Sequence, residues 1–342
     1  MKHAALAILA ALAVTGGWEL QPLTTRASFR GLSVVDAKVA WISGSRATFV
    51  RTTDGGMTWK VDSIAGKGTL DLRDIHAFDA RNAVAISAGE AEKGMANILR
   101  TADGGVTWTV AYTTDMKGVF FDAISFWDAK HGIVMSDPVD NRLFLLTTED
   151  GGKTWSRVDP KGIPQMLEGE AAFAASGTCL TVEGKSNAWI ATGGAAVARV
   201  FRSTDRGRTW TAAATPLHSG DGGAAGAFSV AFTDSKHGIV VGGNYSKPHE
   251  PYVNVALTED GGATWKQPTG ATPPGYLSAV TYLPKSKGRE LVAVGLVGTA
   301  RSSDGGNTWA MIDTVGYNAV AFGSRDRGFA VGDRGRVAKW KP

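Results

Sequence analysis

The chain has 342 residues, of which 20% are charged, and its 36 Lys and Arg against 32 Asp and Glu leave a formal charge of +4. The basic residues are dispersed, with no run of five and no interleaving with aromatic residues, which argues against nucleic-acid binding. The single cysteine, Cys179, excludes an internal disulfide, so stability must come from the packing of secondary structure.

The N-terminal segment has the pattern of an export signal. Lys2 precedes an apolar run from Ala4 to Val14, and small residues follow it. Eleven apolar residues are too few to span a bilayer. We therefore predict a signal peptide over residues 1–16, with Ala11-Leu12-Ala13 as candidate cleavage site, and an exported protein, periplasmic or extracellular. An uncleaved buried strand or a short anchor is the alternative.

A six-residue motif occurs six times and organises the rest of the chain. The first copy is Asp54-Gly55-Gly56-Met57-Thr58-Trp59, and the intervals between the aspartates are 49, 47, 55, 55 and 44 residues. Asp-Gly favours a hairpin turn, and Thr-Trp favours the strand that follows. The other copies have their Asp and Trp at Asp103 and Trp108, Asp150 and Trp155, Asp205 and Trp210, Asp260 and Trp265, and Asp304 and Trp309.

The segments around each motif predict four short antiparallel strands, the sequence unit of a propeller blade. Seven segments can open a blade, from Phe29–Val35 to Tyr317–Phe322, although there are only six motifs. The last unit lacks a fourth strand, and Gly17-Trp18-Glu19-Leu20 has the composition to supply it, since proteins avoid exposed strand edges. We predict an all-β fold, a single seven-bladed propeller over residues 17–342 that the N-terminal strand closes.

The motif resembles the Asp-box, or sialidase-type BNR, repeat, with Arg206 replacing the first glycine in the fourth copy. In that family the boxes are structural turns remote from any active site. The resemblance therefore implies that the six Asp and six Trp residues are structural.

Binding residues are expected on the opposite face, where the longer and more variable loops gather around the central channel. The residues that open the first strands should ring the channel mouth: Arg30, Arg73, Asp74, Asp122, Thr178, Ser229, Ser278 and Asn318. Nearby loops add Arg46, Glu90, Asp137, Glu168, Glu170, Tyr245, His249 and Glu250. From these we predict a binding site made of Arg30, Arg46, Arg73, Asp74, Asp122 and Tyr245. The alternative is a ring that only holds water.

No metal or cofactor is predicted. His131 and His237 occupy equivalent turn positions in two repeats, and the other histidines have no zinc-like spacing. The glycine pairs lie in turns between strands, so they do not form a phosphate-binding loop. Cys179 has no sequence signature of a nucleophile and is expected to be a small buried residue.

Over the whole chain, from Trp18 to Trp340, the sequence is similar to the photosystem II stability/assembly factor family. The similarity rests on the blade number, on the start Trp18-Glu19-Leu20-Gln21-Pro22 and on segments such as Phe29-Arg30-Gly31-Leu32-Ser33. It implies an exported, monomeric, non-catalytic scaffold that binds a protein partner, such as an envelope or membrane protein. In photosynthetic members an arginine-rich patch is associated with that binding. Arg30, Arg46 and Arg73 would form a reduced version among acidic neighbours.

The second hypothesis is a glycan-binding protein or a glycoside hydrolase of the sialidase-like superfamily. Hydrolysis needs two carboxylates facing one cleft, and the candidates are Asp74, Asp122 and Glu170. The Arg-Ile-Pro motif of sialidases is absent, and sialidases have six blades. Asp-box xyloglucanases resemble the chain blade by blade, but they pair two propellers.

Overall fold

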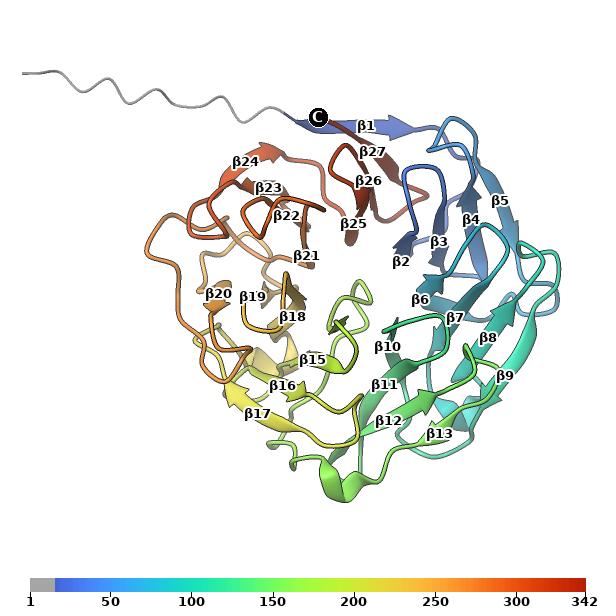
Figure 1. Cartoon of the computed structure of the whole chain (residues 1–342), viewed down its shortest axis with the longest axis horizontal. Helices are drawn as coiled ribbons and strands as arrows, with labels where there is room; N and C mark the ends of the chain where they lie inside the picture. Colours follow the sequence, from blue (N-terminus) through green and yellow to red (C-terminus); the bar gives the residue numbers. More distant parts are fainter. Residues whose placement is uncertain (1–15) are drawn as a thin grey trace, which may run out of the picture.

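The structure, a computed structural model, describes residues 16–342. The predicted signal peptide lies outside the described residues except for Gly16. The chain forms seven antiparallel sheets arranged in a ring around a central channel (Figure 1). The first strand of each sheet lies at the channel and the last lies at the rim, which confirms the predicted all-β, seven-bladed propeller.

The first four blades contain four strands each. Blade 1 consists of β2 (Phe29–Val34), β3 (Ala40–Gly44), β4 (Thr48–Thr52) and β5 (Lys60–Ser63). Blade 2 consists of β6 (Asp71–Ala77), β7 (Ala83–Ala88), β8 (Asn97–Thr101) and β9 (Thr109–Thr113). Blade 3 consists of β10 (Phe121–Phe126), β11 (Gly132–Val139), β12 (Arg142–Thr148) and β13 (Ser156–Arg157). Blade 4 consists of β14 (Leu180–Glu183), β15 (Asn187–Thr192), β16 (Arg199–Ser203) and β17 (Thr211–Ala214).

The remaining blades complete the ring, and three short 3-10 helices lie in the loops. Blade 5 consists of β18 (Ala225–Phe232), β19 (Gly238–Asn244) and β20 (Val255–Thr258). Blade 6 consists of β21 (Ala279–Tyr282), β22 (Leu291–Gly295), β23 (Gly298–Ser302) and β24 (Ala310–Asp313). Blade 7 consists of β25 (Ala319–Ser324), β26 (Arg327–Val331), β27 (Val337–Lys341) and β1 (Gly17–Gln21). The helices are η1 (Ala91–Lys93), η2 (Pro160–Gly162) and η3 (Asp221–Gly223).

The ring closes where β1 pairs with β27, as predicted (Figure 1). Trp18 lies opposite Trp340 in this pairing, and their ring centroids are 5.0 Å apart. The indole Nε1 of Trp18 donates a hydrogen bond to Thr299 Oγ1 of blade 6 at 2.9 Å. The N-terminal strand therefore fastens the last blade and contacts the blade before it.

Blade 5 departs from the four-strand pattern. The segment after its Asp box makes only an isolated bridge between Leu257 and Lys266, with N–O distances of 2.8 and 2.9 Å. Pro268 follows two residues later and has no backbone N–H to extend the ladder. The outer strand of this blade is therefore reduced to a bridge.

The hydrophobic core lies between neighbouring sheets. The second strands β3, β7 and β22 are buried throughout, because adjacent blades cover both of their faces. The Trp residues of the Asp boxes contribute to this packing, since Trp59 contacts Phe329 of the preceding blade at 5.1 Å and Trp108 contacts Phe49 at 5.4 Å. A Cβ on Gly105 would lie 2.4 Å from the ring of Phe49, so only glycine allows this approach.

Each Asp box is a self-contained network of hydrogen bonds. In the first box, Asp54 Oδ1 accepts from the backbone N–H groups of Met57 and Thr58 at 3.0 and 2.9 Å. Its Oδ2 accepts from the Thr58 hydroxyl at 2.6 Å, and Thr52 Oγ1 accepts from Gly56 N at 2.9 Å. The hydrogen bonds to the Asp54 carboxylate, of which that from the Thr58 hydroxyl has the largest effect, lower the pKa of Asp54 to about 2.

No helix among residues 16–342 has the length and apolar character needed to span a membrane.

Candidate binding cavity at the channel mouth

The first strands of four blades carry a β-bulge at the same position. The register shifts at Arg30 in β2, at Arg73 in β6, at Asp122 in β10 and at Phe228 in β18. A bulge inserts one residue and re-aims its side chain. All four bulged residues line one cavity at the channel mouth.

The cavity has a volume of about 470 Å³ and two kinds of wall. Its polar residues are Arg30, Arg73, Asp122, Asp137, Asn318 and Asp333. Its other residues are Phe120, Ala172, Phe173, Ala174, Ala175, Phe228, Tyr245, Tyr276 and Leu296. A cavity with these walls can accept a ligand that has both an apolar and a polar part.

A loop between blades 3 and 4 crosses the mouth and is fixed by the polar side. Arg73 Nη1 donates to the carbonyl of Ala174 at 2.9 Å, and Arg30 Nη1 donates to that of Ala175 at 3.3 Å. Ala172 N donates to Asp137 Oδ1 at 3.3 Å. The two arginines therefore shape the cavity through the loop as well as lining it.

The aromatic wall is built around Phe228. Phe173 stacks on it with ring centroids 3.8 Å apart and an interplanar angle of 14°. Tyr276 and Tyr245 meet its edge at 4.8 and 6.1 Å. Stacked and edge-to-face pairs of this kind give a rigid apolar surface.

Two carboxyl groups in the cavity have raised pKa values. Asp122 is 1% exposed, and burial, together with the proximity of Asp137, raises its pKa well above the ordinary value. Burial raises the pKa of Asp137 to about 6. Within residues 16–342, Asp122 Oδ2 has no hydrogen-bond partner. Burial and the nearby Arg73 lower the pKa of Arg30.

Asp74 lies beside this site and does not line the cavity. Its two oxygens accept hydrogen bonds from the backbone N–H groups of Ile75 and Ile124 at 2.8 and 2.9 Å. Burial raises its pKa to about 7. Gly177 packs so closely against it that a Cβ there would lie 2.3 Å from Asp74 Cγ. The contacts of Asp74 therefore connect blades 2, 3 and 4.

Glu170 and Arg46 are also outside the cavity. The side chain of Glu170 is fully buried and forms an ion pair with Arg199, whose Nε lies 2.9 and 3.1 Å from the two carboxylate oxygens. Thr192 Oγ1 also donates to Glu170, at 2.6 Å. Arg46 is exposed in the turn between β3 and β4, with φ of 60°.

In blade 5 the residue at the channel mouth lies one position before the residue that the sequence predicted. Ser229 was expected at the mouth, but it is buried, accepts from Val280 N at 3.0 Å and bonds to Thr178 Oγ1 at 2.7 Å. Phe228 lies at the mouth instead. The sequence could have indicated this bulge, because aligning Ala227-Phe228-Ser229 with Phe29-Arg30-Gly31 puts Phe228 at the position of Arg30. Ser278 joins the same buried set, since its hydroxyl donates to Asn318 O at 2.6 Å.

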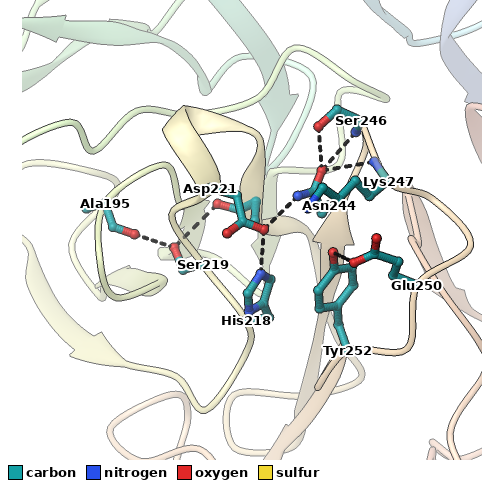
Figure 2. Close-up of polar contacts among 10 residues, drawn as sticks. Ala195, His218, Ser219, Asp221, Asn244, Ser246, Lys247, Glu250 and Tyr252 are labelled. Atoms are coloured by element: carbon teal, nitrogen blue, oxygen red, sulfur yellow. Dashed lines mark hydrogen bonds and ion pairs between the residues drawn. The ribbon is translucent and has the colours of Figure 1, made fainter.

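A polar network next to Tyr245 joins the loop between β17 and β18 to the loop between β19 and β20 (Figure 2). Asn244 Nδ2 donates to Asp221 Oδ2 at 2.7 Å, and His218 Nε2 lies 2.7 Å from the same oxygen. Tyr252 stacks on His218 at 4.2 Å and donates to Glu250 Oε2 at 2.7 Å. Figure 2 shows these side chains converging from both loops. Asn244 and Ser246, the chain neighbours of Tyr245, belong to this network, while Tyr245 itself is 49% exposed.

The other predicted loop residues do not line the cavity: Glu90, Glu168, His249 and Glu250. His131 and His237 lie in equivalent turns, where each bonds to the aspartate three residues earlier at 2.8 Å. No cluster of three or more His, Cys, Asp or Glu that could hold a metal occurs within residues 16–342.

The sequence profile of the family described as "Photosynthesis system II assembly factor YCF48" matches residues 93–226. The chain is an Asp-box propeller that resembles YCF48. No curated protein matches the sequence.

Solved structures agree with the fold of this YCF48-like propeller. One described as "YCF48 bound to D1 peptide" is 18% identical, with a TM-score of 0.66, over 95% of this chain and 97% of that one. YCF48 from Cyanidioschyzon merolae is 16% identical, with a TM-score of 0.68, over 95% and 99%. A GH74 xyloglucanase from Xanthomonas campestris is 16% identical, with a TM-score of 0.64, over 95% of this chain and 53% of that one.

Proposed function

We propose that this YCF48-like propeller is a non-catalytic scaffold that binds a segment of a protein partner at the cavity of the channel mouth. The observation that carries the proposal is the cavity itself, which combines a rigid aromatic wall with a buried, unpaired carboxylate oxygen on Asp122. Aromatic anchors and unsatisfied polar groups favour burial of a few specific side chains. YCF48 has been solved with a D1 peptide, which supports a protein partner for this chain too.

The proposal of a non-catalytic protein is supported by the hydrogen bonds and ion pair that two of the three candidate catalytic carboxylates already make. Both oxygens of Asp74 accept backbone hydrogen bonds, and Glu170 is paired with Arg199. Neither carboxylate is free to act as a nucleophile or a general acid on a ligand in the cavity. Their contacts instead serve to hold neighbouring blades and the crossing loop.

Export is part of the same proposal. It is supported by the sequence of residues 1–16 alone and implies an envelope partner, in the periplasm or outside the cell. Mass spectrometry of the protein purified from its native host should find an N-terminus close to Ala13. An intact Met1 in the envelope fraction would contradict it. We further propose a monomer, which light scattering would test.

The proposal is tested by capture of partners from the native envelope fraction. The YCF48-like chain is compared with Tyr245→Ala and with Arg30→Ala combined with Arg73→Ala, which change the two walls of the cavity. The matched control combines Arg81→Ala with Arg327→Ala, two exposed arginines on the Asp-box face, the first in the turn before β7 and the second at the start of β26. Loss of one captured protein in the cavity variants alone is expected. Equal capture by all folded variants would refute the proposal.

Glycoside hydrolysis is the second candidate, and one observation favours it. Asp122 and Asp137 face the same cavity and both have raised pKa values, as an acid and base pair would. A panel of aryl-glycosides tests this directly. Turnover by the wild-type chain that Asp122→Asn abolishes would replace the scaffold proposal with an enzyme.

A further inference from the structure

Among residues 16–342, the buried side-chain atom of the cavity lining that has no hydrogen-bond partner is an acceptor. Arg73 already donates to Asp71 at 2.6 Å and to the carbonyl of Ala174, and Arg30 donates to that of Ala175. Asp122 Oδ2, in contrast, accepts no hydrogen bond from any described residue and has less than 1 Å² of exposed surface. A buried carboxylate oxygen without a donor is costly, so the ligand that belongs here brings a donor.

The charges around the cavity favour a cation as that donor. The lining contains the two arginines and three aspartates, Asp122, Asp137 and Asp333, so it has one net negative charge when all are ionised. Asp71, which is paired with Arg73, adds a second negative charge at the rim. A neutral donor would leave this charge without compensation.

The aromatic wall suits the rest of such a side chain. Phe173 and Phe228 form a flat apolar surface in the same cavity as Asp122. The aliphatic stem of a lysine or the plane of an arginine packs well on an aromatic face while its charged end reaches a carboxylate.

We propose that the mouth cavity recognises a positively charged side chain of the partner, with its cationic end at Asp122 and Asp137 and its stem on Phe173 and Phe228. This inference rests on the proposed function and names the chemistry of the segment bound. The partner segment is therefore basic at this position, and the two arginines act mainly by holding the crossing loop.

Binding of a cation by this pair depends on pH. Both carboxyl groups have raised pKa values, and that of Asp137 is about 6, so they are protonated in mild acid and bind a cation poorly there. The other charged or titratable groups around the pair are Arg73 and Asp74 on β6, Arg30 on β2, Asp333 after β26 and the buried Cys179 before β14. Of these groups Asp74, whose pKa is about 7 and which does not line the cavity, also gains negative charge between about pH 5 and about pH 8, in the same sense as the pair. The others do not, since Arg stays protonated, the pKa of Asp333 is lowered by its hydrogen bonds and burial raises the pKa of Cys179. Cation affinity should rise with pH in that range.

The test uses capped dipeptides as probes and amide NMR shifts of the isotope-labelled full chain as readout. Acetyl-Phe-Lys-amide is compared with its Nζ-acetylated form, with acetyl-Phe-Glu-amide and with methyl β-glucoside. The protein variants are Asp122→Asn and Asp137→Asn, and the matched control is Asp326→Asn, an exposed aspartate on the Asp-box face. Thermal melts check that each variant is folded.

The lysine probe should shift the Ala172 amide, which donates to Asp137. Acetylation of the lysine, Asp122→Asn or Asp137→Asn should each weaken binding by about tenfold or more, because a charge-assisted hydrogen bond is lost. Binding should strengthen from about pH 5 to about pH 8 in the wild-type chain and in Asp326→Asn only. Equal binding of the glutamate, acetylated or glucoside probe would overturn the inference.

The envelope capture experiment separates this inference from the proposed function. If Asp122→Asn retains the captured protein while Arg30→Ala with Arg73→Ala loses it, the cavity binds a protein but not through a cation. If neither of these variants nor Tyr245→Ala changes capture, the proposed function itself is wrong. Loss of capture in Asp122→Asn but not in Asp326→Asn supports both.

Discussion

Replacing Trp18 by alanine should open the closure of the ring. Trp18 is half-buried, and its indole lies 5.0 Å from Trp340, 5.8 Å from Tyr317 and 6.3 Å from Phe322. A fully buried Trp→Ala change costs about 4 kcal/mol, so half-burial gives about 2 kcal/mol. The hydrogen bond to Thr299 adds about 1 kcal/mol, because the Thr299 hydroxyl is buried and loses its donor. We expect a total loss of about 3 kcal/mol in the free energy of unfolding.

Calorimetry and hydrogen exchange measure this loss. For a chain of this size, about 3 kcal/mol corresponds to a fall in Tm of about 4 °C. The backbone amides of β27 that pair with β1 should exchange faster, while those of blade 3 should not. Leu20→Ala is the matched control, since Leu20 lies on the same strand and is 60% exposed. A Tm for Trp18→Ala within about 1 °C of that for Leu20→Ala would refute the reasoning.

Three further predictions concern buried or bonded carboxylates. Hydrogen bonds from Thr107 lower the pKa of Asp103 to about 2, so Asp103→Ala should lower Tm at neutral pH, and acid melts should show the difference vanishing as the pH falls towards 2. Glu170→Gln leaves Arg199 without its charge partner, which should cost about 3 kcal/mol in urea unfolding and speed proteolysis within residues 160–176, whereas the exposed Glu168→Gln should not. Burial raises the pKa of Asp74 from 3.8 to about 7, so stability should decline as the pH rises between these values, and a decline of equal slope in Asp74→Asn would contradict this.

The sequence predicted the site residues whose position depends only on the local pattern of a first strand. Arg30, Arg73 and Asp122 each follow the first buried residue of a first strand, so they could be assigned to the channel mouth without coordinates. Phe228 occupies the same position but was missed, because an aromatic residue there looks like part of the core. Phe173 and Asp333 could not be predicted, since they come from loops whose course depends on neighbouring blades.

The sequence by itself determined the blade number and the closure of the ring. An Asp box forms its turn through hydrogen bonds within about six residues, so each copy in the sequence predicts one hairpin. The last blade has no Asp box, which indicates that its fourth strand comes from another part of the chain. Only the tertiary structure decided which charged groups are free. Glu170 and Asp122 look alike as acidic residues in loops or strand ends, but Arg199, 29 residues away, neutralises the first and nothing in residues 16–342 pairs with Oδ2 of the second. Such pairing depends on long-range packing of loops and blades, which local sequence patterns do not encode.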